Sequence, residues 1–283
     1  MNLYQNLLLR RVVLPLLKAF NRDIYFSHPW TNEKLRLSLF EHKGYWFHGK
    51  NRENDEMFAF SRLIQPGACV IEVGGHIGFM SLFYAQLVAP PPPAKAGGQV
   101  IVFEPGINNL PYLKTNIANH SNIKLVVAAC SNCDGESIFY IDNLTGQNNS
   151  LVASFEGLKI NSSNAPGISV DIESVAVATV KLDSYTAEFA IKPDFIKIDV
   201  EGHEFAVLTG ADRILSDQFP PILMVEIQSD HEQISNLLHL KGYDLYGSNG
   251  QLIDNVDIAT SGNFFALHQV AHQEAKSRWL IST

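Results

Sequence analysis

An apolar run that ends in a cluster of titratable side chains constrains the fold of this chain more than any other feature. Residues 195–200 have the pattern of a buried strand, and Gly202 supports a sharp change of direction just beyond it. The titratable side chains at this strand end are Asp199, Glu201, His203 and Glu204. Ligands of open α/β sheets bind just beyond the carboxyl ends of the strands. The segment therefore predicts a functional site at a strand end.

A second strand end, upstream, carries a glycine-rich turn. Residues 70–78 run from an apolar strand through Glu72 into Gly74, Gly75 and Gly78. Glycine lacks a Cβ atom, so the backbone of this turn can approach a ligand closely. The helix that begins beyond it offers free N–H groups. The pattern indicates a turn that binds a cofactor.

The order of the expected elements predicts an α/β fold with a mostly parallel sheet. Strands are expected at 69–73, 100–103, 123–129, 195–200 and 222–227, and helices at 79–88, 108–119, 204–215 and 232–241. Such alternation is typical of a parallel sheet covered by helices on both faces. Two late strands, near 243–246 and 263–268, complete the sheet, and we expect the second to be an antiparallel edge strand.

The chain divides into an extension and a main domain. Residues 1–60 are expected to form an N-terminal extension of helix (3–20) and short strands, and residues 61–283 the main domain. Within that domain the polar tract 142–173 interrupts the alternation, and a long irregular segment is usually functional or disordered. Its residues Asn148, Asn149 and Ser150 suit either sugar recognition or a solvated loop.

The N-terminal apolar stretch is too short and too charged to span a membrane. Arg10 and Arg11 interrupt it, and no small-residue cleavage site follows, so it resembles a signal peptide poorly. We expect an amphipathic helix that packs on the domain, on a second copy in a homo-oligomer, or peripherally on a membrane surface, in that order. Cytoplasmic location is the default expectation.

Composition excludes some classes of function. The net charge of −8 disfavours nucleic acid as a partner, because binding phosphates requires a surplus of Lys and Arg. Cys130 and Cys133 form a C-x-x-C pair, but Cys69 is the only other cysteine, so a zinc site is not indicated.

The glycine spacing favours one cofactor over another. Dinucleotides require G-x-G-x-x-G, whereas the glycines here fall at 74, 75 and 78. S-adenosylmethionine fits better, because its ammonium suits the carboxylate of Glu72. Glu104, which ends the second strand, can accept hydrogen bonds from both ribose hydroxyls, although NAD sites use the same device.

These motifs together resemble the FkbM-type, S-adenosylmethionine-dependent methyltransferases, over roughly residues 66–268. The resemblance rests on Ile-Glu-Val-Gly-Gly-His-Ile-Gly (71–78), Val-Phe-Glu-Pro (102–105), Ala-Cys-Ser-Asn-Cys-Asp-Gly (129–135), Ser-Leu (150–151), Val-Lys-Leu-Asp (180–183), Asp-Phe-Ile-Lys-Ile-Asp-Val-Glu-Gly (194–202) and Val-Glu (225–226). It implies a class I (Rossmann-like) methyltransferase fold and methyl transfer, usually to a sugar hydroxyl. Family members usually have Ala-Asn where this chain has Gly75 and His76, so His76 is expected to change the cofactor contacts.

The resemblance implies a set of site residues. Cofactor-binding residues are expected to be Glu72, Gly74, Gly75, His76, Gly78, Glu104, Ala129 and Asp199. Asp199 is the first choice for the group that faces the methyl, as a base, a hydrogen-bond acceptor or a metal ligand. Catalytic roles are also expected for Glu201, His203 and Glu226, although His203 is equally well explained as a surface helix residue. The sequence does not fix a divalent metal site among these four residues.

Other functions stay open at this point. The acceptor is a glycoside, glycolipid or polysaccharide in the preferred interpretation, and another small molecule, a lipid or RNA in the nearest alternative. A binding protein that keeps the fold without turnover is a third interpretation, which His76 would support. A nicotinamide-dependent oxidoreductase is disfavoured by the glycine spacing.

Overall fold

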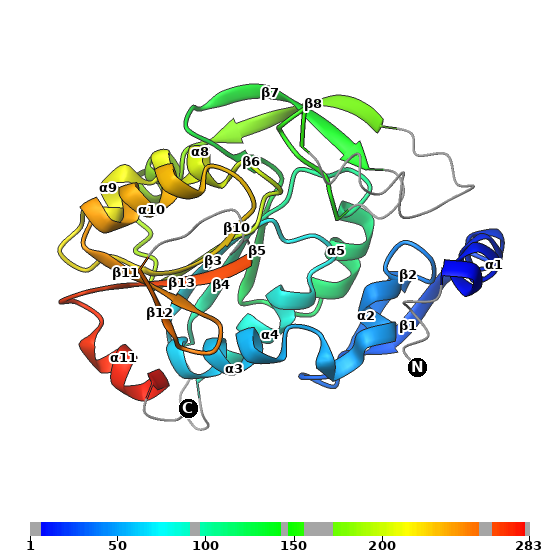
Figure 1. The fold of residues 1–283 in the computed structure, drawn as a ribbon, viewed down its shortest axis with the longest axis horizontal. Helices are drawn as coiled ribbons and strands as arrows, with labels where there is room; N and C mark the ends of the chain where they lie inside the picture. The colour runs from blue at the N-terminus through cyan, green and yellow to red at the C-terminus, as the bar shows by residue number, and fades with distance from the viewer. Residues whose placement is uncertain (1–6, 91–96, 143–146, 156–171, 255–261, 281–283) are drawn as a thin grey trace.

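An eight-stranded sheet forms the centre of the computed structural model (Figure 1). The structure describes residues 7–90, 97–142, 147–155, 172–254 and 262–280. The strands lie in the order β12 (Leu252–Ile253), β11 (Tyr243–Gly247), β13 (Gly262–His268), β10 (Ile222–Ile227), β9 (Phe195–Ile198), β3 (Cys69–Val73), β4 (Gln99–Phe103) and β5 (Ile123–Val126). The neighbours from β10 to β5 pair in parallel, and this order confirms the predicted class I methyltransferase fold.

The direction of the strand order changes between β3 and β9. From β3 the chain proceeds outward through β4 and β5, and from β9 it proceeds the other way through β10. Crossover connections then leave the sheet on opposite sides, which opens a crevice at the carboxyl ends of β3 and β9. The two motif-bearing strand ends of the sequence are therefore adjacent in space.

Two of the expected strands are present, but their positions or bounds in the sheets differ from the prediction. β13 is antiparallel, as expected, but it pairs with both β10 and β11, and the antiparallel edge strand is β12. The strand expected at 123–129 is broken after Val126, because the Ala128 N–H turns back to the Val126 carbonyl (3.1 Å). Its last part becomes β6 (Ala129–Cys130) in a second sheet.

Helices cover both faces of the large sheet. One face is covered by α3 (Asn54–Leu63), α4 (Phe79–Leu87), α5 (Leu110–Ile117) and α11 (Gln273–Leu280). The other is covered by α7 (Leu182–Glu188), α8 (Glu204–Thr209), α9 (Asp212–Leu215) and α10 (His231–Leu240). The strands between these layers are apolar on both sides, as buried parallel strands are. Every residue of β3 is buried, including Glu72.

A three-stranded sheet lies above the large one in Figure 1. It consists of β6, β8 (Ile172–Val180) and β7 (Gly135–Asp142), in that order. The alternation of strands and helices did not predict β8 or α7, because β8 returns antiparallel to β7 rather than crossing over. Part of the expected polar loop, 143–146 and 156–171, lies outside the described residues.

The N-terminal segment packs on the face of the sheet that carries α4. It contains α1 (Leu7–Ala19), β1 (Asp23–Ser27), β2 (Lys34–Ser38), α2 (Lys43–His48) and the 3-10 turn η2 (Gly49–Asn51). β1 and β2 form an antiparallel hairpin. Leu35, Leu37 and Tyr45 belong to the same hydrophobic core as α4. No helix in the described part of the chain has the length and apolar character needed to cross a membrane.

Candidate functional site

The glycine turn after β3 is packed so tightly that side chains are excluded from it. Gly74 has φ of +88°, and a Cβ atom there would lie 1.9 Å from the carbonyl oxygen of Asp199. A Cβ on Gly75 would lie 2.2 Å from a methyl group of Val102 in β4. The turn is thereby held between the ends of β9 and β4, with its backbone exposed to the crevice. Such a surface fits a ligand that must approach the main chain closely.

Glu104, at the end of β4, faces the same crevice. Its Oε2 accepts a hydrogen bond from the His76 N–H (2.8 Å), and its Oε1 accepts from the Gly106 N–H (2.8 Å) and the Asn109 amide (3.2 Å). Burial raises the pKa of Glu104 to about 7, although these three donors lower it. A carboxylate has about four lone-pair sites and three donors already bind Glu104, so Glu104 can accept about one further hydrogen bond from a ligand.

His76 places a neutral imidazole in the wall of the crevice. Its Nδ1 is hydrogen-bonded to the Tyr45 hydroxyl (2.8 Å), and its ring stacks against that of Tyr45. Burial, together with the nearby His42 and Arg52, lowers the pKa of His76 well below its usual value. Its Nε2 is buried and has no hydrogen-bond partner among the described residues. A buried polar atom of this kind is suited to meet a ligand.

Asp199, just beyond β9, is paired with a buried cation. Lys197 Nζ lies 2.8 Å from Asp199 Oδ2 and also donates to the Gly74 carbonyl (3.3 Å). Burial would raise the pKa of Asp199, but the charge of Lys197 and the hydrogen bonds to Glu226 and Lys197 together outweigh burial, and the pKa falls below its usual value. The Asp199 side chain is 28% exposed against 6% for Lys197, so the carboxylate faces the crevice and the ammonium lies beneath it.

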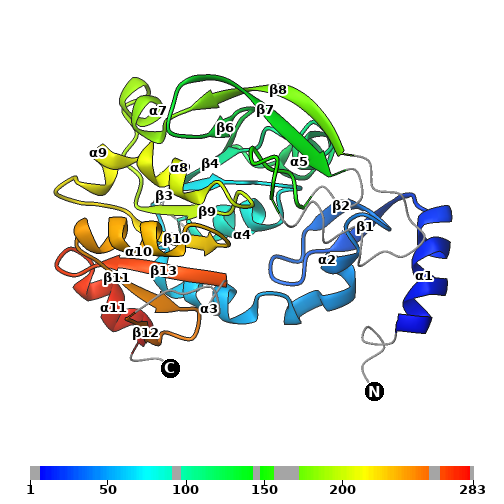
Figure 2. The ribbon, with the colours of Figure 1, turned by 45° about the horizontal axis from the view of Figure 1, so that its top comes forward.

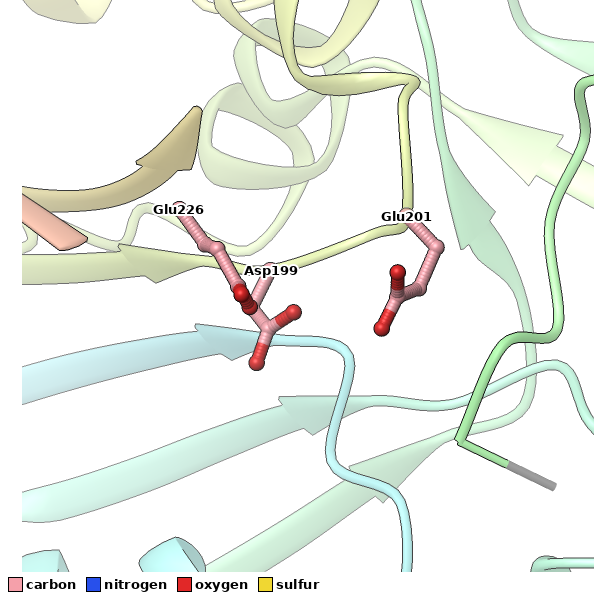
Figure 3. A group of neighbouring side chains, drawn as sticks. All are labelled: Asp199, Glu201 and Glu226. Carbon is pink, nitrogen blue, oxygen red and sulfur yellow. The ribbon is translucent and has the colours of Figure 1, made fainter. Parts of the chain in front are cut away.

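Glu226, from β10, and Glu201, two residues beyond Asp199 on the same loop, flank Asp199 (Figure 3). The charge of Asp199, followed by burial and a hydrogen bond to Asp199, raises the pKa of Glu226 above its usual value. Burial and Asp199 raise the pKa of Glu201, whose Oε2 accepts from the Gln228 amide (2.9 Å). Carboxylate oxygens of the three residues lie within 4.8 Å of one another. A divalent cation at these oxygens stays a prediction.

The polar tract contacts the turn that carries Glu201. The Ser150 hydroxyl donates to the Glu201 carbonyl (2.7 Å), and Glu201 has a φ of 55°, which is unusual for a residue other than glycine. Asn149 donates to the Asn108 side chain (2.9 Å) and accepts from the Asp142 N–H (2.8 Å). The described part of the tract therefore forms one wall of the site.

A single pocket collects most of the predicted site residues. Its lining includes Glu72, Gly74, Gly75, His76, Glu104, Ala129, Asp199, Glu201, His203 and Glu226. Gly78 does not line it, because its missing side chain makes room for Leu113 of α5. Glu72 is 1% exposed and accepts from the Ser81 hydroxyl (2.5 Å), so Asp199 is the more accessible carboxylate beside the glycine turn. His203 Nε2 is hydrogen-bonded to the Ser131 hydroxyl (2.9 Å).

Several lining residues were not identified from the sequence. They are Tyr45, Arg52, Glu53, Lys197 and Asn263. Lys197 had a signal, since a cation within an apolar strand must find a buried partner. The others had none, because they come from the N-terminal segment and from β13, where nothing in the local pattern indicates a pocket.

Comparisons with known proteins agree with this geometry. The sequence profile described as "Methyltransferase FkbM domain" matches residues 72–245. No curated protein sequence matches the chain significantly.

Similar solved structures include three methyltransferase-fold proteins. The methyltransferase FkbM of Methylobacillus flagellatus KT has 16% identity and a TM-score of 0.43, over 71% of this chain and 43% of that protein. The fibrillarin of Aeropyrum pernix, solved with bound S-adenosyl-L-methionine, has 10% identity and a TM-score of 0.42, over 72% and 68%. The precorrin-6y C5,15-methyltransferase of Geobacter metallireducens has 11% identity and a TM-score of 0.38, over 76% and 86%. The chain thus spans less than half of the Methylobacillus protein.

Proposed function

Because the chain belongs to the FkbM methyltransferase family, we propose that it transfers a methyl group from S-adenosylmethionine to a hydroxyl of a sugar, in a glycoside, glycolipid or polysaccharide. The observation that carries this proposal is the contact between the glycine turn and Asp199. It brings the backbone of residues 74–75, the carboxylate of Glu104 and that of Asp199 to one pocket. These are the groups that a nucleoside bearing a charged amino-acid chain requires.

The residues on the β3–β4 side fit the cofactor. Glu104 would accept a hydrogen bond from one ribose hydroxyl, and Ala129, with its small side chain, leaves room for the adenine. The backbone at Gly74 and Gly75 would approach the amino-acid moiety, and Asp199 would meet its ammonium. The unpartnered Nε2 of His76 is available to the polar end of the same moiety.

The residues on the β9–β10 side fit the chemistry at the acceptor. When bound, S-adenosylmethionine supplies an electrophilic methyl group on a sulfonium centre. Asp199 would accept the hydrogen bond of the acceptor hydroxyl and then its proton. Lys197 keeps Asp199 ionised, and the protonated Glu226 donates a hydrogen bond to Asp199. Asp199 is a weak base, which suffices because the hydroxyl proton becomes strongly acidic as the new C–O bond forms.

A polyhydroxylated acceptor fits the polar walls beyond Asp199. Amide side chains of Gln147, Asn148, Asn149 and Asn263 line the pocket, together with Arg52 and Glu53. Amides both donate and accept, as sugar hydroxyls do. Holding the hydroxyl in line with the sulfonium supplies much of the rate of such a displacement.

Calorimetric titration with S-adenosylhomocysteine, with NAD as the comparison, tests the cofactor assignment. Saturable binding of S-adenosylhomocysteine alone is expected, and methyl transfer to a panel of glycosides should follow. Binding of NAD instead would overturn the cofactor assignment. Binding of S-adenosylhomocysteine with methyl transfer only to lipids or RNA would overturn the acceptor class and leave the cofactor in place.

A further inference from the structure

Helix α1 presents an apolar face to solvent at the periphery of the molecule. Figures 1 and 2 both place it beyond the β1–β2 hairpin, away from the large sheet. Val13 is 38% exposed, Leu16 53% and Phe20, directly after the helix, 71%. Their spacing of three and four residues puts them on one side of a helix. None of the described side chains of α1 belongs to either hydrophobic core cluster.

The charge of this segment is opposite to that of the rest of the chain. Residues 1–22 contain Arg10, Arg11, Lys18 and Arg22 and no Asp or Glu, whereas the whole chain has a net charge of −8. The Debye length is about 8 Å at physiological salt, so those cations that lie within this distance of an anionic surface attract it.

We propose that α1 binds the surface of an anionic lipid bilayer, with Val13, Leu16 and Phe20 entering the boundary between headgroups and acyl chains. A bilayer offers apolar and negatively charged material within a few ångströms, which matches both properties of the segment. The α1 helix of a second copy matches only the first, because pairing α1 with α1 would bring six cations together. We call this membrane-binding face of α1, with Val13, Leu16 and Phe20, the anchor. None of these three residues lines the pocket, so the anchor is independent of the methyl-transfer proposal.

Sedimentation of the full chain with lipid vesicles tests the anchor. The protein should sediment with vesicles of equal parts phosphatidylcholine and phosphatidylglycerol, less at high salt, and much less with phosphatidylcholine alone. The double variant Leu16→Gln, Phe20→Gln should lower the partition coefficient at least about tenfold, since each buried side chain of this size contributes about that factor. Lys18→Gln should lower it about fivefold.

A matched control is available at the end of α10. Leu240 is 87% exposed and distant in sequence from α1, so Leu240→Gln should leave the partition unchanged. The anchor is disproved if the wild-type chain does not sediment with the anionic vesicles, or if it sediments equally with neutral ones. It is also disproved if the double variant partitions as the wild type does. A dimer in analytical ultracentrifugation that the double variant dissociates, without vesicle binding, would identify a second copy as the occupant instead.

Discussion

Backbone forms much of one side of the pocket, whereas side chains form the other. On the cofactor side, the surface is the backbone of the glycine turn together with Glu104, and each element follows directly after a strand of the parallel sheet. On the acceptor side, the surface consists of long side chains, including Arg52 and Glu53 near η2 and Asn263 from β13. Asp199 lies where the two sides meet.

This difference shows which properties the fold fixes and which it leaves free. The cofactor side depends on packing between adjacent strand ends, where a Cβ atom at Gly74 would collide with the backbone of Asp199. The acceptor side depends on side chains from segments far apart in the sequence, which can change without disturbing the sheet. We therefore expect substitutions on the cofactor side to affect binding of the nucleoside, and those on the acceptor side to affect recognition of the sugar.

The largest effect is expected at the junction of the two sides. Asp199→Asn keeps the size of the side chain but removes the carboxylate that takes the proton of the acceptor. We expect kcat to fall by roughly 10²–10⁴-fold, with the dissociation constant of S-adenosylhomocysteine changed much less. Steady-state kinetics and calorimetry on the same preparation measure both.

Asp194, at the other end of the same strand, provides the matched control. Its carboxylate accepts a hydrogen bond from the Cys69 N–H (2.8 Å) and does not line the pocket. Asp194→Asn should leave kcat unchanged while lowering stability by about 1 kcal/mol. Full turnover in Asp199→Asn would show that the proton leaves by another route.

The next effect tests the packing of the cofactor side. Gly74→Ala should weaken binding of S-adenosylhomocysteine by about 100-fold or more and lower the melting temperature, because backbone must move to relieve the clash with Asp199. Gly67 has nearly the same φ (+89°), but no atom lies within 4 Å of the place that a Cβ would take there. Gly67→Ala therefore isolates the cost of the left-handed conformation, about 1 kcal/mol. Equal behaviour of the two variants would refute the close approach at Gly74.

The cofactor side of the site could be predicted from the sequence, whereas most of the acceptor side could not. The strand ends at Gly74, Glu104 and Asp199 could be located from the sequence, because apolar runs followed by glycine or acidic residues have a defined meaning in a parallel sheet. The sequence of β8 (Ile172–Val180) is rich in valine and alternates as a strand does, but its antiparallel return to β7 lies outside the alternation of strands and helices, so that pattern does not predict it. Arg52 and Asn263 could not be found either, because long-range packing alone brings them to the pocket.

A smaller effect should appear in the pH dependence of cofactor binding. Burial raises the pKa of Glu104 to about 7, so this carboxyl group is protonated below that pH and loses capacity to accept hydrogen bonds. Affinity for S-adenosylhomocysteine should therefore rise by up to about tenfold per pH unit below pH 7 and level off above it. Calorimetric titrations between pH 5 and 8, about one per half pH unit, measure the slope of the affinity against pH.

Glu104 and Glu204 have similar pKa values, so replacing each in turn shows which of them causes the pH dependence of binding. Glu104→Gln should abolish the slope, because the amide does not titrate. Burial also raises the pKa of Glu204 to about 7, but this residue does not line the pocket, so Glu204→Gln should keep the slope. A slope that persists in Glu104→Gln would assign the titration to another group.

The smallest effect tests whether the N-terminal segment supports the cofactor side as well as the acceptor side. Tyr45→Phe keeps the buried ring but removes the hydroxyl that is hydrogen-bonded to His76 Nδ1 (2.8 Å). The His76 ring loses the contact that orients it, so the dissociation constant of S-adenosylhomocysteine should rise about fivefold, corresponding to about 1 kcal/mol. Tyr112→Phe is the control, because its hydroxyl binds Asp23 outside the pocket (2.9 Å). An unchanged dissociation constant in Tyr45→Phe, with a raised KM for the sugar, would place Tyr45 on the acceptor side alone.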